Sequence, residues 1–290
     1  MILFKKADQL HNYLEEQHQI GKKIGFVPTM GALHPGHISL IEASKKENDL
    51  TVCSIFINPT QFNDPKDYEK YPVTIEKDIY QLETNDCDIL FLPSVKEIYP
   101  ETFKKDVHYG LGYLETVLEG KFRPGHFQGV CMVMHRLLEI IRCDDLYLGQ
   151  KDYQQCMVIK RLIRLIGKKE KINLVVCPTL READGLAMSS RNTRLNKEER
   201  EKAIAIYQAL IFLKNNLKKG NLDELKEKAK QILLDENFRI DYIEIADADS
   251  LELLNEWSER TPSEDGKSKI VALVAAFMNE VRLIDNMVLN

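Results

Sequence analysis

The fold is decided by residues 24–41, which read IGFVPTMGALHPGHISLI. An apolar, β-branched run from Ile24 to Pro28 leads into a glycine-containing turn. Apolar residues at helical spacing follow, among them Ile38 and Ile41. A strand that passes through a tight turn into an amphipathic helix is the first half of a β-α-β unit, the unit from which parallel sheets are built. The stretch therefore predicts an α/β fold.

The same alternation continues through the first 179 residues. Further strands are predicted at 51–58, 87–93, 145–149 and 172–178, and helices at 7–20, 36–48, 74–84, 125–141 and 151–166. Strands that alternate with helices form parallel sheets covered on both faces. We therefore expect a Rossmann-like, doubly wound domain over residues 1–179.

The pattern changes after Pro178. A helix is predicted from the N-cap Asn196 to Leu217, and a second one near 222–236. Three strand-like runs follow at 240–246, 270–277 and 281–288, with a polar loop at 255–269 between the first two. These elements predict a second, smaller α+β domain over residues 180–290.

The composition of the chain excludes several classes of protein. Its 290 residues are 44% hydrophobic and 29% charged, and 40 basic against 45 acidic residues give a net charge of −5. This balance argues against a general affinity for nucleic acid or for anionic membranes. There is no apolar run of ~18 residues and no signal-peptide pattern, so we expect a soluble, cytoplasmic protein. The six cysteines form no CxxC pair, and we expect buried thiols.

Ligands of open parallel sheets bind beyond the carboxyl ends of the strands, so a binding site is expected in the segments that follow each strand. After the first strand, His34 and His37 place two imidazoles on one side of a helix start, where backbone N–H groups favour anions. An arbitrary His-x-x-His pair more often caps a helix or lies on the surface, and zinc would require more ligands nearby. A His-x-Gly-His sequence at a strand-to-helix junction, however, is similar to that of nucleotidyl-transferring enzymes, and it indicates phosphate binding.

Four other segments carry polar side chains that can bind phosphate, carboxylate or hydroxyl groups. Asn58 to Asn63 offers amides, which can bind a carboxylate or hydroxyl without adding charge. Lys151, in the segment 149–155, can act as a point charge on phosphate. Ser189 and Ser190 beside Arg191 can form an oxyanion clamp. The remaining segment, 122–129, contributes Arg123 and a histidine, His126, that we expect to be structural.

Taken together, these motifs resemble those of the pantoate–β-alanine ligase family, also called pantothenate synthetases. The matching stretches are PTMGALHPGH (28–37), NPTQF (58–62), RPGHFQGV (123–130), GQKDYQQ (149–155), READGLAMSSRN (181–192) and RLID (282–285) with Asn286. The resemblance implies an enzyme that condenses (R)-pantoate with β-alanine, using ATP and Mg²⁺, through a pantoyl-adenylate. AMP and pyrophosphate are released, and the product is a precursor of coenzyme A. It also implies a cytoplasmic homodimer whose smaller domain acts as a lid, with no nucleic-acid or membrane partner.

The resemblance also implies roles for individual residues. His37 would be a proton donor, and His34, Lys151, Ser189, Ser190 and Arg191 would act with it in catalysis. Pantoate would contact Gln61 and Gln155, with Asn58 and Arg123 at the edge of its site, and Asp78 would bind magnesium. The implied ATP site comprises Met30, Gly31, Ala32, Leu33, His34, Pro35, Gly36, His37, Gly149, Gln150, Lys151, Asp152, Leu180, Met188, Ser189, Ser190 and Arg191.

Two other functions remain open from the residues alone. One is a different His-x-Gly-His nucleotidyltransferase, which would move AMP or CMP onto a phosphorylated acceptor. The other is a nucleotide-binding regulator without catalysis, but such a protein gains little from groups that stabilise a transition state. The amides at Asn58, Gln61, Gln154 and Gln155 favour an uncharged hydroxy-acid pocket, and so favour the ligase.

Overall fold

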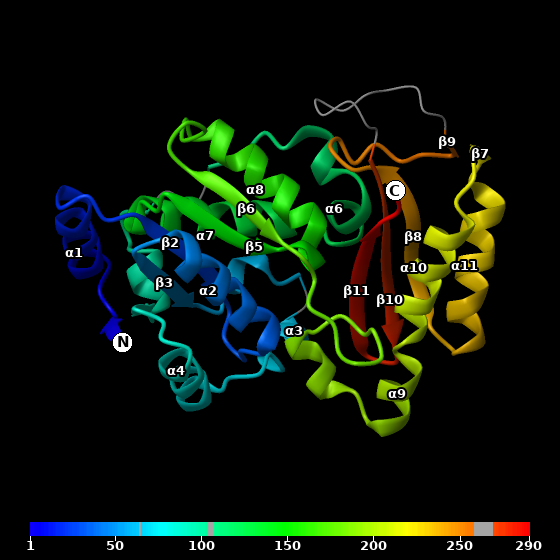
Figure 1. The fold of residues 1–290 in the computed structure, drawn as a ribbon, viewed down its shortest axis with the longest axis horizontal. Coiled ribbons are helices and arrows are strands. Elements are labelled where there is room, and N and C mark those ends of the chain that lie inside the picture. Colours follow the sequence, from blue (N-terminus) through cyan, green and yellow to red (C-terminus); the bar gives the residue numbers. More distant parts are fainter. Residues whose placement is uncertain (64, 104–106, 258–268) are drawn as a thin grey trace. The chain divides into compact units, whose positions relative to one another are not determined.

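The structure is a computed structural model that describes residues 1–63, 65–103, 107–257 and 269–290 (Figure 1). The chain forms two compact units. The first comprises Met1–Gln150 and Gln154–Pro178, and the second comprises Lys151–Tyr153 and Thr179–Asn290. Most of the loop predicted at 255–269 lies outside the described residues. No described helix has the length and apolar character needed to cross a membrane.

A six-stranded parallel sheet forms the centre of the first unit (Figure 1). Its strands, in spatial order, are β1 (Ile2–Phe4), β4 (Ile89–Phe91), β3 (Leu50–Ile55), β2 (Ile24–Thr29), β5 (Asp145–Gly149) and β6 (Asn173–Cys177). All adjacent strands pair in parallel. The predicted doubly wound α/β class is confirmed.

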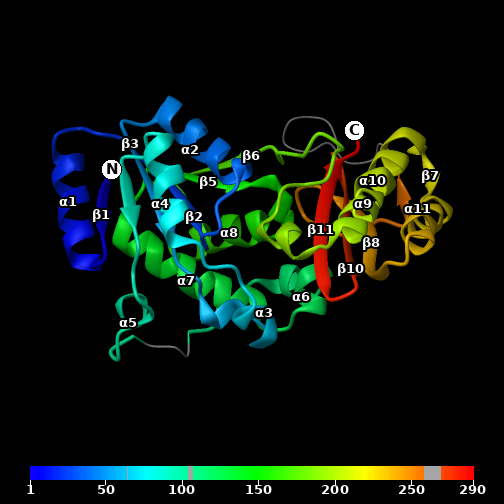
Figure 2. The same ribbon diagram turned by 90° about the horizontal axis from the view of Figure 1, so that it is seen from below.

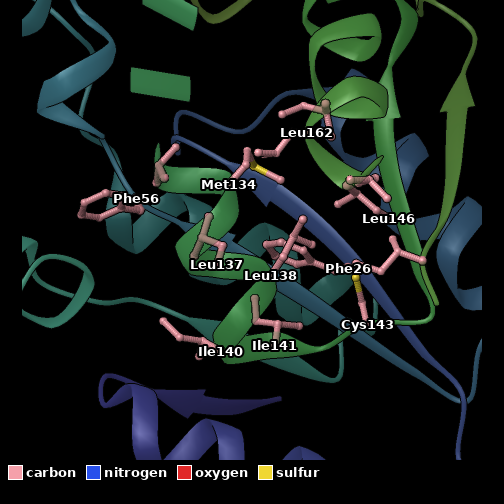
Figure 3. Packing of buried hydrophobic residues seen from close by; sticks show 14 of the residues in the cluster. Phe26, Phe56, Met134, Leu137, Leu138, Ile140, Ile141, Cys143, Leu146 and Leu162 are labelled. Atoms are coloured by element: carbon pink, nitrogen blue, oxygen red, sulfur yellow. The ribbon is translucent and has the colours of Figure 1, made fainter. Parts of the chain in front are cut away.

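Helices cover both faces of this sheet because side chains alternate between faces along each strand. Phe26 and Leu146 belong to one apolar cluster, together with Leu138 and Leu162 from two helices (Figure 3). Val27 and Tyr147, the next residue of each strand, belong to another. The first face packs against α1 (Ala7–Gln19), α7 (His126–Ile141) and α8 (Tyr153–Leu165), and the second against α2 (Pro35–Glu47) and α4 (Ile75–Thr84).

Shorter helices connect these elements and matter for the site. They are α3 (Pro65–Glu69), α5 (Val95–Ile98) and α6 (Leu118–Phe122), with the 3₁₀ turns η1 (Pro59–Gln61), η2 (Gly112–Glu115) and η3 (Gln150–Asp152).

The second unit contains a three-stranded antiparallel sheet in the order β11 (Val281–Val288), β10 (Ile270–Met278), β8 (Arg239–Asp247). Two helices, α10 (Ala205–Asn216) and α11 (Asp223–Asp235), pack against it around a common apolar core (Figure 2). The turn η4 (Ser190–Arg194), α9 (Lys197–Lys202) and the short ribbon of β7 (Gly220–Asn221) and β9 (Glu256–Trp257) complete the unit. The predicted small α+β fold is confirmed.

Several elements differ from the prediction, and the short helices α3, α5 and α6 and the strands β7 and β9 were not predicted. Strand β1 was not predicted, because a three-residue strand carries too little pattern to be recognised. The strands predicted at 51–58 and 87–93 end early, at Ile55 and Phe91. The single helix predicted from Asn196 is divided into α9 and α10, where the Ile206 N–H bonds to the carbonyl of Ala203, three residues back instead of four.

The start of α9 and the cysteines agree with the prediction. Asn196 caps α9 in a reciprocal pair with Glu199, whose backbone N–H and carboxylate both take part. All six cysteines are free and buried. Burial raises the pKa of the Cys87 thiol to about 11 and that of Cys131 to about 12, which keeps both protonated at neutral pH.

Candidate active site

The order of the strands reverses between β2 and β5. From β2 the chain moves to β3 and β4 on one side, and β5 then pairs with the other side of β2. The pairing of β2 with β5 involves only Gly25 with Asp145 and Phe26 with Leu146, whereas β2 pairs with β3 from Ile24 to Thr29. The carboxyl ends of β2 and β5 are therefore not paired with each other. Such a reversal point is where doubly wound sheets bind their ligands.

The turn after β2 is held in place by a buried carboxylate. Gly31 and Ala32 both have positive φ, 82° and 49°, so two successive N–H groups turn toward one point. There Asp78 Oδ2 accepts from Ala32 N at 2.9 Å, and Asp78 Oδ1 accepts from Leu33 N at 2.8 Å. Asp78 Oδ1 also accepts from the hydroxyl of Thr74 at 3.0 Å. The side chain has no solvent exposure, so Asp78 positions the turn.

These contacts take up both acceptor positions of Asp78 Oδ1 and one of Oδ2, so the structure gives the carboxylate a role in holding the turn. Its expected role as a magnesium ligand stays a prediction. Among the described residues, no group of three or more His, Cys, Asp or Glu side chains is arranged to hold a metal ion.

The two histidines of the next turn are fixed by backbone hydrogen bonds. His34 is the N-cap of α2, and its Nδ1 accepts from Gly36 N at 3.2 Å. Nδ1 of His37 accepts from His34 N at 3.3 Å, and the two ring centroids are 4.0 Å apart. An imidazole nitrogen that accepts carries no proton, so each neutral ring carries its proton on Nε2. Both Nε2 atoms are therefore donors at the N-terminus of a helix, an arrangement that favours an anion.

The amide segment after β3 contains one structural amide. Asn58 is only 1% exposed. Its Nδ2 donates to Gln61 Oε1 at 3.3 Å and to the carbonyl of Gly129 at 3.1 Å. Its Oδ1 accepts from Thr60 N, from the Thr60 hydroxyl and from the Tyr99 hydroxyl at 3.3, 3.0 and 2.9 Å. Asn58 therefore holds η1 in place.

Gln61, at the end of η1, is the half-buried amide of this segment. Its Nε2 lies 2.7 Å from Sδ of Met30, so the structure brings two of the predicted stretches together. The close approach of η1 to α7 requires a glycine, because a Cβ on Gly129 would lie 2.1 Å from the Thr60 carbonyl oxygen. This contact explains the second glycine of RPGHFQGV, Gly129.

Arg123 is connected to the same segment through His126. The ring of His126 is 6% exposed, and its Nδ1 donates to the carbonyl of Gln61 at 2.7 Å. The proton is therefore on Nδ1, and Nε2 accepts from an Arg123 guanidinium N–H at 3.1 Å. The same guanidinium nitrogen lies 3.4 Å from the Glu119 carboxylate. His126 thus links Arg123 to the backbone of Gln61.

The neighbouring glutamines of α8 differ in their surroundings. Gln154 is 2% exposed, and its amide bonds to the backbone of Glu119, Leu114 and Val117. Gln155 is half-buried, and its side-chain amide makes no hydrogen bond with the described part of the chain. Gln155 is therefore the one of the two whose amide is available to a ligand.

The other predicted site residues belong to the second unit. The ammonium of Lys151 lies 3.5 Å from the carboxylate of Asp152. Ser189 caps η4, with its hydroxyl accepting from Arg191 N at 3.3 Å, and Ser190 is buried. Leu180 is 39% exposed. The site residues of the first unit are Met30 to His37, Asn58, Gln61, Asp78, Arg123, Gly149, Gln150 and Gln155, and those of the second are Lys151, Asp152, Leu180 and Met188 to Arg191.

The fold and the histidine-capped helix place the chain in the class of doubly wound α/β proteins with a His-x-Gly-His helix start. Within that class, residues 2–288 match the family model described as pantoate-beta-alanine ligase, and the chain belongs to that family.

Similar proteins agree over the whole length of the chain. A pantothenate synthetase of Thermosipho africanus is 42% identical over 291 residues, with 100% of both chains covered. One of Cytophaga hutchinsonii is 41% identical, covering 100% of this chain and 99% of its own.

Solved structures show the same fold. Pantothenate synthetase from Thermus thermophilus superimposes with a TM-score of 0.87 at 37% identity, with 99% of each chain covered. Pantoate-beta-alanine ligase from Francisella tularensis, complexed with beta-gamma ATP and beta-alanine, gives a TM-score of 0.80 at 39% identity, covering 99% of this chain and 97% of its own.

Proposed function

We propose that this enzyme condenses (R)-pantoate with β-alanine at the expense of ATP, through a pantoyl-adenylate, and releases AMP and pyrophosphate. The product is pantothenate, a precursor of coenzyme A. Family membership over residues 2–288 and the ligands of the Francisella tularensis relative support the proposal. The observation in this chain that carries it is the pair of Nε2 donors that His34 and His37 present at the start of α2.

The first step joins two anions. The carboxylate of pantoate attacks the α-phosphate of ATP, so catalysis requires donors that offset the charge that builds up there. We assign this role to Nε2–H of His34 and His37, to the ammonium of Lys151 and to Ser189, Ser190 and Arg191. As the proton donor, His37 would pass its Nε2 proton toward a phosphate oxygen. Magnesium would enter bound to the phosphates of ATP, and we give Asp78, which accepts from the N–H groups of Ala32 and Leu33, the role of holding the turn.

The nucleotide and the hydroxy acid are assigned to different residues. Met30 to His37, Gly149 to Asp152, Leu180 and Met188 would bind ATP. Gln61 and Gln155 would bind the hydroxyl and carboxylate of pantoate, since uncharged amides recognise both without adding charge. Arg123 would attract the carboxylate, with its direction set by His126. Asn58 would act through Gln61.

The intermediate is an acyl-phosphate anhydride that water would hydrolyse, so the site needs a cover while β-alanine attacks. We propose that residues 180–290 serve as this lid, with the segment 181–192 at its base. We further propose that the enzyme works in the cytoplasm as a homodimer.

The proposal is tested by supplying ATP, pantoate and β-alanine and measuring the products. The expected result is one AMP and one pyrophosphate for each pantothenate formed. Transfer of AMP or CMP to a phosphorylated acceptor, with no amide product, would support the other nucleotidyltransferase instead. Nucleotide binding without turnover would support the regulator.

A further inference from the structure

Strand β11 carries a charged residue in an apolar row. Val281 and Leu283 point into the core of the second unit, and alternation along the strand places Asp285 on that same face. Asp285 is only 4% exposed. An isolated carboxylate in such a place is costly, so an oppositely charged partner is expected.

Arg181 is that partner. Its guanidinium donates to both carboxylate oxygens of Asp285, at 2.6 and 3.0 Å, and to the carbonyls of Gly185 and Asn286 at 3.0 and 3.2 Å. It also lies over the ring of Tyr207, 4.7 Å from the ring centroid. A bidentate pair fixes the orientation of the guanidinium relative to the carboxylate, in addition to pairing their charges. It therefore fixes the position of the segment that contains Arg181 relative to β11.

The next residue of β11 extends this arrangement to Lys151. Asn286 is 2% exposed, and its Nδ2 donates to the backbone carbonyl of Lys151 at 2.8 Å. Asn286 N bonds to Asp285 Oδ1 at 2.8 Å, so the pair and the amide form one network. This network fixes the backbone from which the Lys151 side chain extends.

The same strand also contacts the proposed phosphate clamp. The turn η4, which contains Ser190 and Arg191, packs against β11 within the second unit. Strand β11 is therefore the common support of two groups assigned to the phosphates of ATP.

We propose that Asn286 is a positioning residue, which sets Lys151 relative to η4, and that the buried Arg181–Asp285 pair holds Asn286 in place. The proposal rests on the function proposed above, in which Lys151 acts on phosphate. Asn286 itself touches no substrate in this account. Its effect is transmitted through the Lys151 carbonyl.

The test uses the full-length enzyme and the pantoate-dependent exchange of labelled pyrophosphate into ATP. Asn286→Leu keeps the branched shape of the side chain and removes the donor, and Asn286→Ala removes the donor without added bulk. The expected result is a fall in kcat of about tenfold or more, since small displacements of a catalytic group are costly, with an unchanged KM for pantoate. In a Lys151→Ala background, the same changes are expected to cause no further loss.

The matched control is Val281→Ala, which weakens the same strand at a buried position far along it from Asn286. It should lower thermal stability but leave kcat per folded molecule unchanged. The inference is overturned if the Asn286 variants keep the wild-type kcat, or if their loss multiplies with that of Lys151→Ala. It is also overturned if Lys151→Ala is itself fully active. The proposed function fails on a different result, the absence of pantoate-dependent exchange in the wild-type enzyme.

Discussion

The backbone N–H of His34 donates to Nδ1 of His37 at 3.3 Å, and this bond determines which nitrogen of His37 carries the proton. With Nδ1 occupied as an acceptor, Nε2–H is left as the donor of the neutral ring. The hydrogen bond that helps to cap α2 thus also sets the tautomer that the proposed role of His37 as a proton donor requires.

Replacing His37 with alanine removes that donor. One lost donor at a developing negative charge typically costs about 100- to 1000-fold in rate, so His37→Ala should lower kcat by this factor and leave ATP binding largely intact. Steady-state kinetics and nucleotide titration measure the two effects. The exposed His108 supplies a control, since His108→Ala should retain wild-type kinetics. Wild-type turnover by His37→Ala would remove His37 from the mechanism.

Asp78→Asn tests whether this carboxylate holds the turn or binds a metal. The amide can accept from only one of Ala32 and Leu33, and its NH₂ group faces the other N–H. We expect a loss of about 1–3 kcal/mol in unfolding free energy. The rate of pantoate-dependent exchange of pyrophosphate into ATP should fall, while the magnesium concentration that gives half-maximal activity stays the same. A large rise in that concentration, with stability unchanged, would return Asp78 to the role of metal ligand.

Gly129→Ala tests the link between α7 and η1. The new Cβ would lie 2.1 Å from the Thr60 carbonyl oxygen, so η1 must move and carry Gln61 with it. Overpacking of this kind costs about 1–3 kcal/mol, and the KM for pantoate should rise. Gly110→Ala is a matched control, because nothing lies within 4 Å of its new Cβ. An unchanged KM in the folded Gly129 variant would contradict the assignment of Gln61 to pantoate.

Glu97→Gln tests a helix cap supplied from a distant part of the chain. The N-cap of α1, Lys6, makes no side-chain cap, and Glu97 accepts instead from Ala7 N at 2.8 Å. This hydrogen bond, with help from Lys6, lowers the pKa of Glu97. Because the folded-state pKa is lowered, the stabilisation is fully present above the unfolded pKa of about 4.3 and is lost as pH falls through the folded value.

The expected difference between wild type and Glu97→Gln is about 1 kcal/mol at pH 7, and it should shrink as the pH falls through the lowered folded-state pKa of Glu97. Urea unfolding across this pH range measures it. A difference that persists at low pH would show that the carboxylate charge has no part in the cap.

The sheet and the loops of the site were predictable because their signals are local. The run at 24–28 is mostly apolar, the run at 145–149 contains Leu146, Tyr147 and Leu148, and polar residues follow each run. The pair His34 and His37 can be recognised by its spacing and by its place after the end of a strand. Most helices were also predicted to within one or two residues, since apolar spacing and caps lie within each segment.

Contacts between distant residues were not predictable in this way. Asp78 reaches Ala32 across 46 positions, and Asn286 reaches Lys151 across 135. In the sequence Asp78 is one acidic residue of a helix start, and Asn58 is one amide of a loop. Burial and hydrogen bonding distinguish a side chain that can bind a substrate from one that holds the backbone in place. Both properties arise only when the fold brings the partners together. Asp285 gave one local signal, a charge in the row that otherwise holds the apolar residues Val281, Leu283 and Met287.

The central claim is that this enzyme activates a carboxylic acid by adenylation. The most direct test is the exchange of labelled pyrophosphate into ATP with pantoate present and β-alanine absent. The account predicts exchange that requires pantoate and does not require β-alanine. Exchange that proceeds without pantoate, or that appears only when β-alanine is added, would contradict it.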